Sequence, residues 1–174
     1  MKRIAAVLLA AALVAAGGPL PAAGEGQSAP AEALGPVTRL PLPRYVSLRS
    51  NEINVRRGPG LDYRKDWVFR RAGLPVRVVD EYGDWRRIVD SDGAGGWVYH
   101  SLLSGRRTVL VTSPMATLRD RPVETAVPVA EAEQGVVARL DACEPRWCRI
   151  AIEGVEGWAL REALWGTEGA EAGG

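Results

Sequence analysis

Residues 53–60, INVRRGPG, and residues 95–103, GGWVYHSLL, decide the fold of this chain. In the first stretch, apolar and polar residues alternate until Gly58, Pro59 and Gly60 interrupt them, which is typical of a short strand that enters a rigid turn. We expect the two glycines to take positive φ around a proline of fixed φ, so these three residues have a structural role. The second stretch predicts a strand followed by one 3₁₀ turn. Short apolar runs and turn residues lie between them, so the sequence predicts a small all-β module.

Both ends of the chain are expected to lie outside the folded part. Residues 1–24 combine a basic start, a short apolar run and a small-residue exit, which is the layout of a cleaved secretory signal. The apolar run is too short to span a bilayer, so no transmembrane segment is expected after cleavage. Residues 25–43, rich in Ala, Pro and Gly, are predicted to be a disordered linker, and residues 167–174 a disordered tail. The signal predicts a periplasmic or secreted protein.

The part between these ends contains an internal repeat. Three segments align without gaps on later ones: 53–56 on 116–119, 73–88 on 135–150, and 96–105 on 157–166. In the last two alignments Trp falls on Trp. The offset stays at 61 to 63 residues, and a fixed offset of this size is typical of a duplicated supersecondary unit. We therefore predict two tandem domains, at residues 44–111 and 112–166.

Three motifs of the first copy, NVRRGPG, GDWRRI and GGWVYHSLLSG, resemble the bacterial SH3-like (SH3b) domain family. The second copy ends CRIAIEGVEGWALREALWG and is similar to a degenerate tandem partner, because it lacks the GPG turn. The likeness covers residues 44–166 and extends to double-domain exported proteins of Gram-negative bacteria. It implies two small, partly open β-barrels with a groove lined by aromatic residues. It also implies a binding or targeting module, often attached to cell-wall enzymes; it does not imply a catalytic activity.

The aromatic residues supply the candidates for such a groove. Six Trp and four Tyr stand against one Phe, and Trp and Tyr are favoured at interfaces because they combine apolar area with a polar group. Trp85 shares a strand face with Arg87, so it should point outward or into a groove; packing against the other copy is the alternative. Three tyrosines come from places that converge in an SH3-like barrel. The predicted groove is Trp85, Tyr82, Tyr63, Tyr99 and Arg87. Trp97 and Trp158 are expected to lie at least partly in the core.

Cys143 and Cys148 bracket a four-residue turn of a predicted hairpin. Residues placed in this way lie opposite each other at a separation that a disulfide tolerates, and an exported chain meets oxidising surroundings. We predict a disulfide, with a bulge near the turn that brings both side chains to one face. The alternatives are a metal site, which would lack two of the usual four ligands, and a redox pair, which usually has C-x-x-C spacing.

The charge is spread unevenly over the two copies. Residues 44–107 carry 13 Lys and Arg against 8 Asp and Glu, and residues 108–166 carry 6 against 9. The first copy could face an anionic partner, or the two copies could attract each other. A nucleic-acid partner is not expected outside the cytoplasm. His100 has no carboxylate in its own stretch, so we predict no catalytic residue. No metal and no cofactor are expected either.

These observations favour a non-catalytic exported binding module. Its first domain would recognise a cell-wall polymer, through a peptidoglycan peptide, or an envelope protein. Two alternatives stay open: a small cell-wall hydrolase that depends on His100, and a structural adaptor that acts through protein contacts alone.

Overall fold

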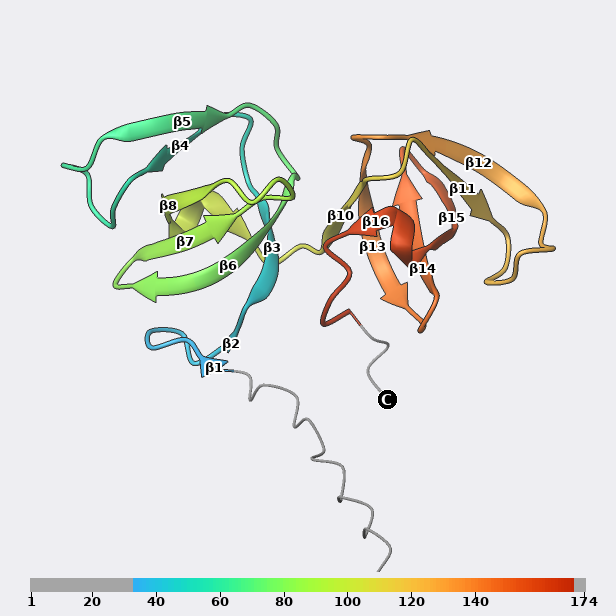
Figure 1. Ribbon diagram of the computed structural model, residues 1–174, viewed down its shortest axis with the longest axis horizontal. Coiled ribbons are helices and arrows are strands. Elements are labelled where there is room, and N and C mark those ends of the chain that lie inside the picture. The colour runs from blue at the N-terminus through green and yellow to red at the C-terminus, as the bar shows by residue number, and fades with distance from the viewer. Residues whose placement is uncertain (1–32, 171–174) are drawn as a thin grey trace, which may run out of the picture. The chain divides into compact units, whose positions relative to one another are not determined.

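The computed structural model describes residues 33–170, which fold into β-strands and two single 3₁₀ turns (Figure 1). The predicted signal peptide, residues 1–24, lies outside the described residues, as do residues 25–32 of the predicted linker. The strands form two seven-stranded sheets and one two-stranded sheet. Between residues 33 and 170 the structure contains no helix with the length and apolar character needed to cross a membrane.

The first domain is an antiparallel sheet with the strand order β5-β4-β8-β7-β6-β3-β9. Its elements are β3 (Arg44–Leu48), β4 (Ile53–Arg56), β5 (Lys65–Phe69), β6 (Pro75–Tyr82), β7 (Trp85–Val89), β8 (Gly95–Tyr99), the 3₁₀ turn η1 (His100–Leu102) and β9 (Leu103–Ser104). Alternate side chains of these strands point into one apolar core, as the period of two requires. The buried residues of this core are Leu48, Ile53, Val55, Val76, Val78, Ile88, Val98 and Leu103.

The second domain repeats this arrangement in the order β12-β11-β15-β14-β13-β10-β16. Its elements are β10 (Thr108–Val111), β11 (Met115–Arg119), β12 (Pro128–Glu133), β13 (Val137–Cys143), β14 (Trp147–Ile152), β15 (Val155–Leu160), the 3₁₀ turn η2 (Arg161–Ala163) and β16 (Leu164–Trp165). Each sheet has a register shift at the same place, between Val78 and Asp80 in the first and between Leu140 and Ala142 in the second. The prediction of two tandem all-β domains is therefore confirmed.

The boundary between the domains lies earlier than the sequence suggested. Residues 108–111 were assigned to the end of the first domain, but β10 pairs with β13 and β16 of the second sheet. The reason is the repeat itself: β10 is the counterpart of β3, which pairs with β6 and β9 in the same way.

Part of the predicted linker is ordered. β1 (Ala33–Leu34) and β2 (Pro41–Leu42) form a small antiparallel hairpin, closed by a hydrogen bond from Gly35 N to Leu40 O of 2.8 Å. Composition suggested disorder because this segment cannot form a core of its own. It is ordered because the carboxylate of Glu81, in the first domain, accepts hydrogen bonds from its backbone.

The start of the predicted tail is ordered as well. Ala170 packs against the second core, and its carbonyl accepts a hydrogen bond of 3.0 Å from Cys143 N. The guanidinium of Arg107 donates to the carbonyls of Gly166, Glu168 and Gly169. Backbone groups that a composition argument does not consider therefore fix residues 167–170.

Cys143 and Cys148 form the predicted disulfide, with a Cα–Cα distance of 4.1 Å. They are the only cysteines of the chain, so no thiol is free. The expected bulge is present, as the register shift between Leu140 and Ala142, but the disulfide does not need it. Two residues that flank a four-residue turn are directly opposite in the ladder and share a face, and the turn is closed by Glu144 N donating to Trp147 O at 2.7 Å.

Candidate functional site

Three of the predicted groove residues form one row across the first sheet. Tyr82 on β6 lies opposite Trp85 on β7, and Trp85 lies opposite Tyr99 on β8, so the three side chains share a face. The rings of Trp85 and Tyr99 meet edge to face, with centroids 5.6 Å apart. Tyr82 is 66% exposed and Tyr99 is 38% exposed. This aromatic row offers flat apolar area and two hydroxyl groups to solvent.

A second row lies two residues along the same strands. Arg87 on β7 is opposite Trp97 on β8, and Trp97 is opposite Arg56 on β4. Arg87 is exposed, whereas Trp97 and Arg56 are half-buried. Arg87 was predicted as a groove residue, Trp97 was expected to lie at least partly in the core and is half-buried, and Arg56 was missed. Strand parity could have found Trp97, because it lies two residues from Tyr99 and must share its face.

Tyr63 does not join the aromatic row. It lies in the loop after the GPG turn, and its ring covers Gly58 so closely that an added Cβ there would come within 2.4 Å of it. The guanidinium of Arg56 donates to the carbonyls of Leu61 and Tyr63, at 2.8 and 2.7 Å, which fixes the loop. Tyr63 therefore packs on the turn, outside the strand ladder that forms the row.

The turn is structural, as predicted, but for a different reason. Neither Gly58 nor Gly60 has positive φ. Gly60 N donates to Gly58 O at 3.0 Å, which places Pro59 at the centre of a three-residue turn. Gly58 is required because the ring of Tyr63 fills the space that a side chain would occupy.

Asp84 connects the aromatic row to the only histidine of the chain. Its Oδ2 accepts a hydrogen bond of 3.0 Å from the hydroxyl of Tyr99, and this bond raises the pKa of Tyr99. Its Oδ1 lies 3.9 Å from His100 Nε2, and His100 N donates to Asp84 O at 2.8 Å. Sequence reasoning missed this carboxylate because it looked only next to His100, whereas the strand pairing brings Asp84 in from the β6–β7 turn.

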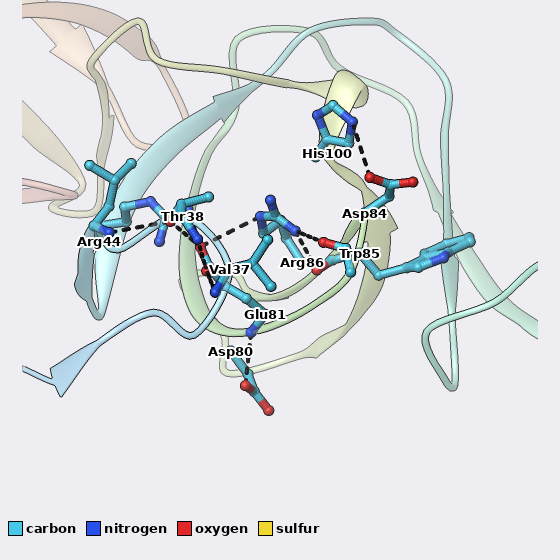
Figure 2. Close-up of polar contacts among 11 residues, drawn as sticks. Val37, Thr38, Arg44, Asp80, Glu81, Asp84, Trp85, Arg86 and His100 are labelled. Atoms are coloured by element: carbon cyan, nitrogen blue, oxygen red, sulfur yellow. Dashed lines mark hydrogen bonds and ion pairs between the residues drawn. The ribbon is translucent and has the colours of Figure 1, made fainter.

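A buried carboxylate, that of Glu81, comes directly before Tyr82 on β6 (Figure 2). The side chain of Glu81 is 0% exposed; it accepts from Val37 N and Thr38 N at 3.0 and 2.8 Å and from the Thr38 hydroxyl at 2.6 Å. Arg44 donates to it at 2.7 Å, and Arg86 Nε lies 3.6 Å away. Burial opposes its ionisation, but these hydrogen bonds prevail and lower the pKa of Glu81 to about 2.

The Trp85 ring points away from this cluster, whereas Arg86 points toward it (Figure 2). A hollow of about 240 Å³ lies beside the cluster and is lined by Arg44, Arg86, His100, Thr38 and Ser104 together with aliphatic residues. No group of three His, Cys, Asp or Glu side chains within residues 33–170 could hold a metal ion.

The second copy has lost the aromatic row. Trp147 takes the place of Trp85 but is only 6% exposed, and Leu160 lies opposite it where the first copy has Tyr99. Glu144 replaces Tyr82 in the alignment. The open row is thus a property of the first domain alone.

The two copies also differ in what joins β6 to β7 and β13 to β14. Cys143 and Cys148 align with Glu81 and Arg86, and each pair is directly opposite in its ladder. The second copy has a disulfide where the first has a buried ion pair.

Comparison with known proteins places these features in a family context. A stretch of 126 residues is 27% identical to YrvJ of Bacillus subtilis, a protein named as a candidate N-acetylmuramoyl-L-alanine amidase; the match covers 66% of this chain and 24% of YrvJ. Two solved structures are similar at low sequence identity: NlpC2 from Trichomonas vaginalis (14% identical, TM-score 0.34) and an NlpC/P60 family protein from Bacillus cereus (16% identical, TM-score 0.31).

These matches cover 71% and 70% of this chain, and 48% and 55% of the two structures. This chain therefore spans about a quarter of YrvJ and about half of each solved structure. The family model of the bacterial SH3 domain matches residues 49–105 and again residues 112–166, one match for each sheet. The chain belongs to the bacterial SH3 domain family, with two tandem copies.

Proposed function

We propose that this chain is an exported, non-catalytic module that binds a cell-envelope ligand, a peptidoglycan peptide or a partner protein, through the aromatic row of its first domain. The observation that carries the proposal is the open row of Tyr82, Trp85 and Tyr99, which the second copy has lost. Exposed aromatic side chains with fixed rings supply much of the binding energy at interfaces. Peptidoglycan is the first ligand to test, because the name of YrvJ refers to an enzyme of this polymer.

Export is part of the proposal. It is supported by the signal-like sequence of residues 1–24 and by the disulfide, since disulfides persist in oxidising compartments. Both cysteines are joined in the disulfide, so a cysteine nucleophile is not available.

The test is retention of the mature chain, residues 25–174, on purified sacculi. Retention should fall at least tenfold in a Trp85→Ala, Tyr82→Ala double variant, because two anchors are removed. Glu144→Ala, at the position of Tyr82 in the second copy, is the matched control and should bind like the wild type. A wild-type chain that sacculi never retain would refute the peptidoglycan version, and chemical crosslinking in the envelope would then decide whether the chain is an adaptor that contacts proteins only.

A hydrolase is the second candidate, because Asp84 lies 3.9 Å from His100 Nε2, with Ser101 next in sequence. Incubation of peptidoglycan with the mature chain should release no new fragments. Fragments that disappear with His100→Ala would establish catalysis instead.

A further inference from the structure

The second domain holds two arginines with two carboxylates on its outer sheet face. Arg139 on β13 pairs with Asp141, with Nε–Oδ1 at 2.8 Å, and reaches Glu156 on β15, with Nη2–Oε1 at 3.3 Å. Arg149 on β14 also pairs with Glu156. Glu156 thus receives a guanidinium from each of two strands.

The first domain keeps both arginines and neither carboxylate. Arg77 and Arg87 align with Arg139 and Arg149. Val79 aligns with Asp141. Glu156 lies opposite Ala151 in the second sheet, and Gly95 lies opposite Val89 in the first. Val89 aligns with Ala151, so Gly95 is the counterpart of Glu156.

No side chain of the described part of the molecule replaces these carboxylates. Within residues 33–170, neither Arg77 nor Arg87 makes an ion pair or a hydrogen bond, and the Nε of Arg77 is buried without a partner. Asp80 is opposite Arg87 in the ladder, but its Oδ1 accepts a hydrogen bond of 2.8 Å from Glu81 N. Arg87 is exposed and Arg77 is half-buried.

Position 95 of the first domain cannot carry a carboxylate side chain like that of Glu156. A Cβ on Gly95 would come within 2.4 Å of the carbonyl oxygen of Ile88, a backbone atom that cannot move aside easily. The first copy therefore keeps its two cationic side chains next to a position that carries no side chain.

We propose that Arg77 and Arg87 form a binding site for a carboxylate of a peptide ligand, at the place that the Glu156 carboxylate occupies in the second domain. Guanidinium groups suit carboxylates because they donate parallel hydrogen bonds in a fixed plane. Arg87 lies two residues along β7 from Trp85, about 7 Å. A peptide that places its carboxylate at Arg87 can therefore lay its neighbouring residue on the aromatic row. The inference rests on the proposed function for the identity of the ligand as an envelope peptide.

The first test uses ¹⁵N-labelled mature chain and NMR titration with N-acetylalanine or with its amide. The Nε–Hε signal of Arg87 should shift with the acid and stay in place with the amide. The shift should vanish in Arg87→Gln and remain in Arg149→Gln. Arg149 is the matched control because it already pairs with Glu156. Equal shifts with acid and amide, or equal loss of the shift in both variants, would overturn the inference.

The second test uses sacculi whose carboxylates have been converted to amides with a carbodiimide and ammonia. Retention should fall about tenfold on amidated sacculi and in Arg87→Gln, because one charge-assisted contact is lost. Retention that is insensitive to both changes overturns the carboxylate site and leaves the proposed function standing. If no sacculi retain the wild type while the NMR shift persists, the peptidoglycan function fails and the carboxylate site stands.

Discussion

Replacement of Glu81 by Gln is the perturbation whose effect follows most directly from the geometry. The side chain is 0% exposed, and it holds Arg44, Arg86 and the backbone of Val37 and Thr38. The pKa lowered from 4.5 to about 2 corresponds to about 3 kcal/mol in favour of the charged form. Removing one partner of a buried ion pair costs about 3–5 kcal/mol. We therefore expect Glu81→Gln to lower the free energy of unfolding of the first domain by about 3 kcal/mol.

Amide hydrogen exchange of residues 25–174 separates the two domains and measures this change. Protection of the Val78 amide should fall by about 100-fold, which corresponds to about 3 kcal/mol. The amides of Val37 and Thr38 should lose protection too, because their acceptor is weakened. Amides of the second core, such as that of Ile150, should change little.

The pH dependence supplies an independent check. The folded-state pKa of Glu81 is depressed, so its stabilisation is fully present above the ordinary value of 4.5 and is lost as the pH falls from there toward 2. This part of the acid sensitivity should disappear in Glu81→Gln. Glu52→Gln, an exposed position in the same domain, should behave as the wild type. Wild-type protection in Glu81→Gln, within about threefold, would show that the buried carboxylate does not hold the hairpin and the domain together.

Two further predictions concern crosslinks and turns. Replacing both cysteines, Cys143→Ser with Cys148→Ser, should destabilise the second domain by about 2 kcal/mol, because the closed loop is short, and should leave the exchange of first-domain amides unchanged; a loss shared by both domains would contradict this. Gly58→Ala should cost about 1–3 kcal/mol by overpacking against the ring of Tyr63, and thermal unfolding should show most of that cost removed in the Gly58→Ala, Tyr63→Ala double variant; an equal cost in both backgrounds would rule out the ring as the cause.

The fold was predictable because its signals are local and repeated. Short strands are indicated by the alternation around Ile53 and Val55 and by turn residues at short spacing. The repeat, with Trp aligned on Trp, shows the same pattern a second time and so strengthens the prediction of two similar domains. The disulfide followed from the spacing of the two cysteines and from the oxidising surroundings expected for an exported chain. Tyr82, Trp85 and Tyr99 were placed together from the resemblance to an SH3-like barrel, and the observed strand register puts them on one face.

The remainder depends on contacts between segments distant in sequence, which composition does not encode. Residues 33–43 resemble a linker until Glu81, 43 residues after Thr38, is brought against them. Gly58 requires glycine because of a ring five residues later, not because of its own φ. Trp97 is half-buried, within the expected range, but its place on the face of Tyr99 was missed, although adjacent residues of a strand point to opposite faces and Val98 is buried.

The exchange of an ion pair for a disulfide at equivalent positions has a consequence for biogenesis. Glu81 and Arg86 associate as soon as their strands meet, whatever the redox potential, whereas Cys143 and Cys148 need an electron acceptor before they join. The amino-terminal copy can therefore mature without any oxidant, and the carboxy-terminal copy completes its covalent link only after reaching one.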